Sequence, residues 1–241
     1  MVVKSQIKFI KSLQQKKYRL QNRLFVVEGI KTVRELLASS LKPYKVYVKD
    51  ASILNEHLTD IEVISEADLK KMSGLATPNK VVGVFHFPEP KPVDYSGWVI
   101  ALDDVRDPGN LGTIIRLCDW FGISDLICSL KTVDCYNPKT LQATMGSISR
   151  VNIVYKELPL VIEEAGSMVV GAFMDGEVVY KSSLPSTGIL VMGNEANGIS
   201  NEIERIVNKR ISIPQFGPKT AESLNVATAT AILLSEIRRS G

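Results

Sequence analysis

Three polar segments of the sequence carry side chains that could bind and orient a ligand. In the first, an Asp107-Pro108-Gly109 turn leads into Asn110, which stands where a helix is expected to begin. Arg116 follows nearly two turns later, so it could lie on the same side of that helix as Asn110. A capped helix with a surface arginine explains this segment equally well.

The second segment runs from residue 190 to residue 198. Gly193 permits close approach of a ligand to the backbone, and Glu195 offers a carboxylate beside it. A tight turn before a helix would explain Gly193, Asn197 and Gly198 without any ligand. Alone, this motif decides nothing.

The third segment covers residues 211–231. Pro214 ends an apolar run, a polar loop follows, and Ser223 could cap the last helix. The small residues at 227–229 would let a ligand approach the start of that helix. An ordinary cap with close helix packing is the alternative explanation.

The elements that must position these segments follow from the alternation of apolar strands with helices after Trp98. Helices between strands predict a parallel sheet that is covered on both faces, in an α/β fold. In such sheets ligands bind beyond the carboxyl ends of the strands, where all three segments fall. The expected strands are 99–102, 126–128, 151–154, 168–173, 188–192 and 211–213, and the expected helices are 111–121, 139–146, one before Gly166, 202–207 and 224–238.

The first part of the chain predicts a separate, smaller α/β unit. Its apolar runs and amphipathic stretches are 25–27, 30–38, 46–48, 61–64, 66–72 and 81–87. Pro88, Pro90 and Pro92 then interrupt any strand or helix, so residues 88–97 are expected to be a linker. We therefore expect an N-terminal domain at 1–87 and a C-terminal domain at 98–241.

Positive charge is concentrated at the N-terminal end. Residues 1–50 contain 12 Lys or Arg against 3 Asp or Glu, a net +9, although the whole chain carries only +3. A run of Lys16, Lys17, Arg19 and Arg23 around Tyr18 favours a polyanion such as RNA as the partner. The alternative is a solvated helix face, because Lys4, Lys8 and Lys11 recur at helical spacing.

Several other classes of protein are disfavoured. Three cysteines without a CxxC pair, and only His57 and His86 as imidazoles, predict reduced thiols and no metal site. The absence of GxGxxG and Walker A sequences disfavours a nucleotide-dependent oxidoreductase. No run is long enough for a membrane span and no signal-type apolar region follows Met1, so we expect a soluble cytoplasmic protein.

Taken jointly, the three segments resemble the motifs of the SpoU (TrmH) family of RNA ribose methyltransferases. The matching residues are 110–116, 193–195 with Gly198, and 213–214 followed by 223–227. The N-terminal part, including Arg19, residues 25–29 and residues 73–78, resembles the family's small substrate-binding domain, which is similar in fold to certain ribosomal proteins. The resemblance implies a SPOUT-class catalytic domain with a deep C-terminal trefoil knot, and a homodimer with composite active sites.

The activity implied by this resemblance is S-adenosylmethionine-dependent 2′-O-methylation of RNA. Ribosomal RNA is the expected substrate, transfer RNA the closest alternative, and an inactive RNA-binding or ribosome-assembly factor the alternative of another class. The implied catalytic and substrate-orienting residues are Asn110, Arg116, Glu195, Ser223 and Asn225. The implied donor-binding residues are Thr144, Ala172, Gly193, Asn194, Ile213 and Leu224, and the RNA-binding candidates are Lys16, Lys17, Arg19 and Arg23.

Proposals for this family make the arginine the general base, and the sequence departs from the family pattern at three places. A guanidinium rarely gives up its proton, so Arg116 is better suited to anchor phosphate or stabilise charge, with base character induced by bound RNA as an addition. Thr144-Met145-Gly146 stands where many members have Ser-Ala-Gly, and Ala196 replaces a common glycine. The loop 215–222 is slightly longer than usual, which could alter substrate choice.

Overall fold

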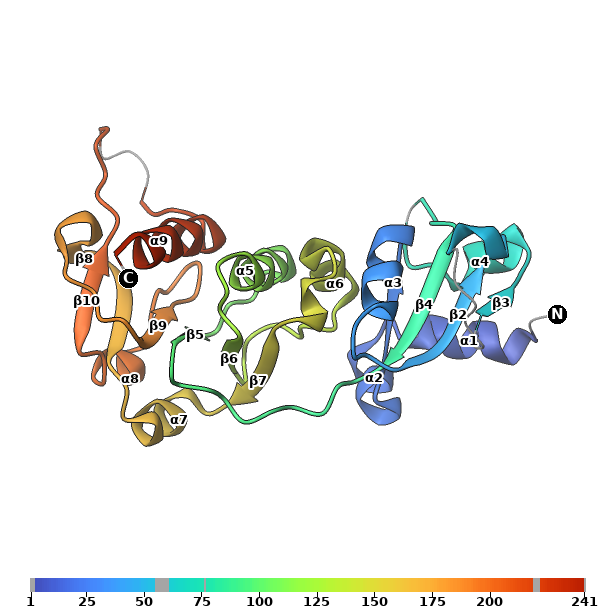
Figure 1. Ribbon diagram of the computed structural model, residues 1–241, viewed down its shortest axis with the longest axis horizontal. Coiled ribbons are helices and arrows are strands. Elements are labelled where there is room, and N and C mark those ends of the chain that lie inside the picture. The colour runs from blue at the N-terminus through green and yellow to red at the C-terminus, as the bar shows by residue number, and fades with distance from the viewer. Residues whose placement is uncertain (1–2, 55–60, 76, 219–221, 241) are drawn as a thin grey trace. The chain divides into compact units, whose positions relative to one another are not determined.

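The computed structural model describes the chain except for residues 1–2, 55–60, 76, 219–221 and 241. The chain forms two compact units (Figure 1). The first comprises Met1–Glu89 together with Asp134–Ser149, and the second comprises Pro90–Val133 with Arg150–Gly241.

The first unit is built on a four-stranded mixed sheet in the order β1-β4-β2-β3. β4 pairs antiparallel with both β1 and β2, whereas β3 runs parallel to β2. Its elements are α1 (Lys4–Ser12), α2 (Lys16–Asn22), β1 (Leu24–Glu28), α3 (Ile30–Leu37), β2 (Pro43–Val48), η1 (Ala51–Ile53), β3 (Ile61–Val63), α4 (Glu66–Met72), β4 (Val81–His86), α6 (Pro138–Thr144) and η2 (Ser147–Ser149).

Helices cover both faces of this sheet. On one face, Ile10 of α1 and Met72 of α4 share a buried cluster with strand residues such as Val26 and Val84. On the other, α3 packs against β1 and β4, and its Val33 is fully buried. Burial is nearly continuous along β1 and β4, as two covered faces require, because successive side chains of a strand point to opposite faces.

The segment Asp134–Ser149 packs in the first unit, although we expected it inside the C-terminal domain at 98–241. Two interactions hold it there. The ring of Tyr136 stacks on Phe87 with centroids 4.1 Å apart and lies 4.8 Å from Phe25. Asp134 forms a 2.6 Å ion pair with Arg19, whose side chain is almost fully buried. Neither contact leaves a periodic pattern in the sequence from which it could be predicted.

The second unit has the expected parallel sheet, here six-stranded in the order β10-β8-β9-β5-β6-β7. All of its strand pairs are parallel. Its elements are β5 (Trp98–Leu102), α5 (Pro108–Trp120), β6 (Asp125–Ser129), β7 (Asn152–Lys156), α7 (Leu158–Ala165), β8 (Val169–Val178), η3 (Val179–Lys181), β9 (Gly188–Met192), α8 (Asn201–Glu204), β10 (Lys209–Ser212) and α9 (Val226–Ser240).

The two faces of this sheet carry different helices. Leu158 and Ile162 of α7, with Ile203 of α8, share a buried cluster with the strands on one face. α5 and α9 pack against each other and bury residues such as Ile114 and Leu234. These buried faces fix the strand ends at which the polar segments emerge.

Most expected elements are present, with three differences. α2 was not expected, because its sequence is dominated by charge and buries only Arg19. β8 continues to Val178, five residues beyond the expected end, while α8 has a single turn ending at Glu204. The extension of β8 matters because it forms one wall of the pocket described below.

Three further observations concern the cysteines, the helices and possible metal ligands. Cys118, Cys128 and Cys135 are buried and unbridged, and burial raises the pKa of the Cys118 thiol. Within the described residues, none of the helices combines the length and hydrophobicity needed to traverse a bilayer. The described residues also contain no group of His, Cys, Asp and Glu that could hold a metal ion, and His57 lies outside them.

Candidate functional site

The three polar segments follow the carboxyl ends of β5, β9 and β10 in the second unit. The β5 segment leads into α5, whose first turn begins at Pro108. The side chain of Asp107 caps this helix by accepting a 2.8 Å hydrogen bond from the backbone N–H of Asn110. Asn110 is therefore the third helical residue and not the cap, contrary to expectation, and its side chain is free to bind elsewhere.

That side chain meets Glu195 from the segment after β9. Asn110 Nδ2 donates to Glu195 Oε1 at 3.0 Å. The backbone N–H groups of Arg106 and Asp107 also donate to the Glu195 carboxylate, each at 3.3 Å. Three donors thus hold the carboxylate at the start of α5, where the helix dipole also favours negative charge.

The same amide meets Asn225 from the segment after β10. Asn225 Nδ2 donates to Asn110 Oδ1 at 2.8 Å. The Oδ1 atom of Asn225 accepts hydrogen bonds from the backbone N–H groups of Ala227 and Thr228, at 3.0 and 3.2 Å. Asn225 therefore caps α9, and the expectation that Ser223 is the cap is wrong.

The turn after β9 is closed by its own hydrogen bonds. Asn194 and Gly198 exchange two backbone hydrogen bonds of 2.9 Å, and Asn194 Oδ1 accepts from the N–H groups of Ala196 and Asn197. A Cβ atom on Gly193 would lie 2.2 Å from the carbonyl carbon of Gly198. Glycine is thus required at 193 by the turn itself, which agrees with the explanation of this segment as a tight turn.

One residue with a strained backbone contacts this turn. Asp104 follows β5 with a φ of 59°, an unfavourable region for a residue with a side chain. Its carbonyl accepts a 2.6 Å hydrogen bond from Asn194 Nδ2, and its carboxylate pairs with Arg106. The hydrogen bond to Asp104 raises the pKa of the Arg106 guanidinium. These contacts hold the strained residue between the first two segments.

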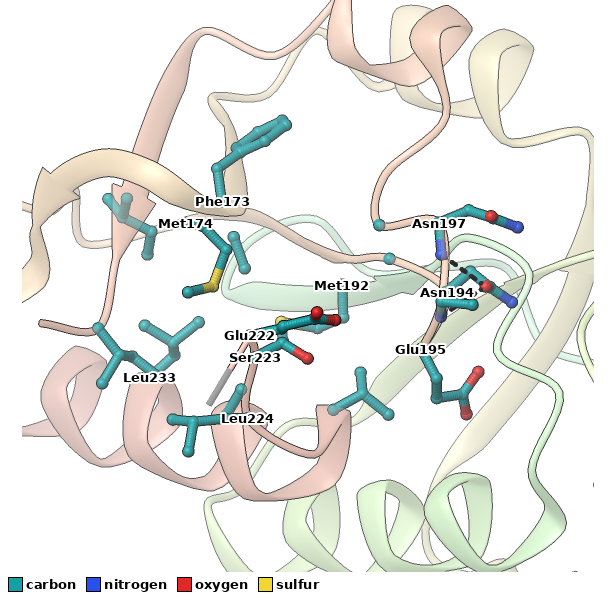
Figure 2. A pocket seen from close by; sticks show the side chains of 18 of the residues that line it. Phe173, Met174, Met192, Asn194, Glu195, Asn197, Glu222, Ser223, Leu224 and Leu233 are labelled. Atoms are coloured by element: carbon teal, nitrogen blue, oxygen red, sulfur yellow. Dashed lines mark hydrogen bonds between the residues drawn. The ribbon is translucent and has the colours of Figure 1, made fainter. Parts of the chain in front are cut away.

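A pocket of about 660 Å³ opens between the segments after β9 and β10 and the extended β8 (Figure 2). Its apolar walls come from Met192, Ile211, Ile213, Leu224 and Leu233. Two carboxylates, Glu195 and Glu222, also line it, and none of its described lining residues is Lys, Arg or His. The volume lies within the usual range for small organic ligands, and the charge favours one that carries positive charge.

Five of the six expected donor-binding residues line this pocket: Ala172, Gly193, Asn194, Ile213 and Leu224. The sixth, Thr144, does not. It is fully buried in the first unit, where its hydroxyl donates a 2.8 Å hydrogen bond to the carbonyl of Leu141. Thr144 is therefore a helix residue whose hydroxyl binds the preceding turn of its own helix.

Sequence reasoning missed other lining residues. Met174 comes from the part of β8 that was not expected, and Glu222 closes the loop 215–222. Met192 was recognised only as a strand residue and Leu233 only as a helix residue. The loop itself lies partly outside the described residues, since 219–221 are not among them. In the sequence, the position of Glu222 directly before Ser223 was the signal that could have identified it as a lining residue.

Arg116 lies apart from the hydrogen-bonded cluster. Its side chain is exposed on α5, and it makes no hydrogen bond or ion pair with the described part of the chain. It is also absent from the pocket lining. The guanidinium is therefore free to meet an anion that the protein itself does not supply.

The four RNA-binding candidates in the first unit divide into two kinds. Lys16 and Lys17 are exposed, and Arg23 is exposed and paired with Glu89 at 2.9 Å. Arg19 is 2% exposed and donates to Asp134 and to the carbonyls of Leu13 and Gln14. Arg19 is a structural residue here, because its donors are already used inside the unit.

Comparison with known proteins extends over both units. The model of the SpoU rRNA Methylase family matches residues 97–235, and that of an MRM3-like substrate binding domain matches residues 4–83. The chain is 33% identical over 239 residues to the 23S rRNA (guanosine(2553)-2'-O)-methyltransferase RlmP of Bacillus subtilis, covering 96% of this chain and 95% of that protein.

Two solved structures resemble the whole chain. A TrmH-family structure from Porphyromonas gingivalis shares 38% identity with a TM-score of 0.91, covering 100% of both chains. An AdoMet-bound rRNA methyltransferase from Sinorhizobium meliloti shares 32% identity with a TM-score of 0.86, covering 99% of this chain and 96% of that one.

Proposed function

We propose, for a chain that belongs to the SpoU rRNA methylase family, the transfer of a methyl group from S-adenosylmethionine to a ribose 2′-hydroxyl of ribosomal RNA. The resemblance inferred from the three motifs is thereby confirmed. Ribosomal RNA is favoured over transfer RNA because the full-length relative and the bound-cofactor structure are both named for rRNA.

The residues present suit the methyl donor. S-adenosylmethionine combines a flat purine with a positively charged sulfonium, and the pocket combines apolar walls with Glu195 and Glu222. A basic side chain in the lining would repel the sulfonium, and the described lining contains none. When bound, the donor supplies an electrophilic methyl group; the chain has to orient it, hold the ribose and exclude competing water.

The observation that carries this proposal is the double hydrogen bonding of Asn110 to Glu195 and Asn225. One side chain thereby joins its own segment to two others, 85 and 115 residues further along the chain, at the rim of the pocket. Glu195 is saturated by three donors, so we assign it an organising role and not that of a base. We assign Ser223 and Asn225 to the side of the site that contacts the ribose.

We assign Arg116 to the RNA. In the reaction the oxygen–methyl bond forms as the sulfur–methyl bond breaks, and the hydroxyl proton leaves. An exposed guanidinium, with its planar set of N–H donors, suits a phosphate or the developing negative charge better than proton removal. In the first unit, Lys16, Lys17 and Arg23 supply further phosphate contacts.

Three finer features belong to the same proposal. A C-terminal knot is supported by the path of the chain, since β10 lies outside β8 at the sheet edge and α9 then returns to pack against α5. A homodimer is carried over from the family resemblance. A cytoplasmic location is supported by the bacterial rRNA methyltransferase that the chain resembles over nearly its whole length. Sedimentation of the purified protein tests the dimer.

The direct test is to map ribose methylation in ribosomal and transfer RNA from cells with and without this protein. We expect one ribosomal 2′-O-methyl group to disappear and to return when the purified protein and S-adenosylmethionine are added to the RNA. Calorimetry separates an enzyme from an inactive assembly factor, because only the enzyme needs the donor. A protein that binds no S-adenosylmethionine would overturn the proposal.

A second test concerns the basic residues. Replacing Lys16, Lys17 and Arg23 together by alanine should weaken RNA binding and flatten its salt dependence. Each phosphate contact that is lost reduces the number of counterions released when the RNA binds. Donor affinity should not change. Unchanged RNA affinity would restore the interpretation of these residues as a solvated face.

A further inference from the structure

An aromatic cluster lies at one end of the sheet in the first unit, outside the site described above. The rings of Tyr44 and His86 meet edge to face, with centroids 5.8 Å apart and an interplanar angle of 72°. Phe9 of α1 lies on the other side of Tyr44, with a centroid distance of 6.2 Å. These three rings come from α1, β2 and β4.

The cluster packs against the protein core on one side and is exposed to solvent on the other. Phe9 packs against the buried core between α1, α4 and the sheet. Tyr44 is nevertheless 45% exposed, and His86 is exposed as well. A large ring that is held by neighbours and open to solvent loses little conformational entropy when another flat group stacks on it.

Strand register places positive charge beside these rings. The backbone N–H of His86 donates to the carbonyl of Lys42 at 3.0 Å, so Lys42, the residue before β2, is the neighbour of His86 across the sheet. The Lys42 side chain is exposed. Arg23 lies across from Phe87, on the opposite face of the sheet, and is paired with Glu89, so it is not part of this cluster.

We propose that Tyr44 and His86 form a stacking site for an unpaired base of the substrate RNA, with Lys42 contacting an adjoining phosphate. Aromatic rings flanked by cations are what single-stranded nucleic acid requires, because the rings take the bases and the cations the backbone. The net charge of +9 over residues 1–50 complements a polyanion. The inference rests on the proposed function, and it narrows the substrate to RNA that contains an unpaired nucleotide.

The experiment uses the full chain with two probes, a 12-nucleotide single-stranded RNA containing 2-aminopurine and the duplex of the same length. Tyr44→Ala should weaken binding of the single strand about tenfold, since stacking on one aromatic ring contributes ~1–3 kcal/mol per base. Tyr44→Phe should restore it, because the ring face remains. Val63→Ala, at a position 57% exposed on β3 of the same sheet, is the matched control and should bind normally.

Salt dependence separates stacking from charge. Tyr44→Ala should leave the slope of log K against log salt unchanged, whereas Lys42→Ala should reduce it by about 0.7 for one single-strand phosphate. Wild-type protein should change the 2-aminopurine emission on binding, and Tyr44→Ala should not. A melting temperature within a few degrees of wild type shows that the variant is folded. If Tyr44→Ala does not fold, the same measurements are made on His86→Ala.

The outcomes are distinct. Equal affinity of Tyr44→Ala and wild type, or equal losses for single strand and duplex, would overturn the stacking site and leave the proposed methyltransferase function intact. Wild-type protein that binds neither RNA would overturn the RNA part of the proposed function itself. Failure of Tyr44→Phe to restore binding would show that the hydroxyl, and not the ring, makes the contact.

Discussion

The amide nitrogen of Asn225 donates a 2.8 Å hydrogen bond to the side-chain oxygen of Asn110, although 115 residues separate the two in sequence. The same Asn110 side chain uses its own nitrogen to bind Glu195 at 3.0 Å. Both ends of one amide are therefore occupied, and its orientation is determined by its partners. This relay makes the geometry of the whole site depend on the difference between an amide and a carboxylate.

Asn110→Asp tests that dependence. The substitution keeps an acceptor for Asn225 but places a carboxylate against Glu195, so a hydrogen bond becomes a like-charge contact. We expect methylation to fall by about a hundredfold and the melting temperature by several degrees, for a loss of ~2 kcal/mol. Single-turnover methylation and thermal unfolding measure the two effects.

The matched control for that variant is Asn201→Asp. Asn201 is exposed in the first turn of α8, where an added negative charge is tolerated. It should retain full activity and stability. If Asn110→Asp behaved like this control, the relay would have no catalytic role.

Arg116→Ala tests the exposed guanidinium. Because Arg116 lines no part of the pocket and has no described partner, its loss should spare both folding and donor affinity. Turnover should become undetectable, since the RNA anchor or charge stabilisation is lost. Calorimetry with S-adenosylmethionine and single-turnover kinetics give the two readouts, and Arg205→Ala, also exposed, is the control. Near-normal methylation would remove Arg116 from the site.

Glu222→Gln tests the charge of the pocket. Glu222 has no hydrogen bond or ion pair with the described residues, whereas Glu195 is held by three donors. Glu222 is therefore the carboxylate free to attract a sulfonium. We expect the variant to bind S-adenosylmethionine about five- to tenfold more weakly, with the attraction reduced by solvent screening.

The demethylated product lacks the sulfonium charge, so its affinity for Glu222→Gln should match that for wild type. Titration with both compounds gives the ratio. Equal weakening of the two would indicate that Glu222 contacts a group they share, such as the ammonium, and no weakening would place it outside the donor site.

Arg19→Ala and Lys17→Ala separate structure from RNA binding in the basic segment. Removing Arg19 leaves Asp134 and two backbone carbonyls without their buried donor, which should cost about 3–5 kcal/mol of unfolding free energy. Lys17 is exposed, so its removal should change stability by less than ~0.5 kcal/mol while weakening RNA binding. Urea unfolding followed by circular dichroism decides, and equal stabilities would contradict the structural role of Arg19.

Periodicity and turn chemistry in the sequence were sufficient to predict the parallel sheet and nearly all of its strands. β9 occupies its expected residues, 188–192, because a continuous apolar run between two turns has few alternatives. β8 was predicted five residues too short, since its second half is exposed and polar and is held in the sheet by pairing with β10. Pairing partners are distant in sequence and leave no local pattern.

The sequence by itself determined which residues are the candidates for the site: Asn110, Glu195 and Asn225 were all named from their segments and the family resemblance, and their side chains meet in the structure. Only the tertiary structure decided what each of them does locally. It assigned the cap of α5 to Asp107 and the cap of α9 to Asn225. It also buried Arg19 against Asp134, a residue we had expected in the other domain.

The physical reason is the range of the interactions involved. Side-chain type, turn propensity and strand periodicity act over a few residues and can be recognised along the chain. A hydrogen bond between Asn110 and Asn225, or an ion pair between Arg19 and Asp134, exists only after folding brings distant segments within about 3 Å. Whether a polar residue caps a helix, lines a pocket or is buried as a structural ion is decided by those distant partners.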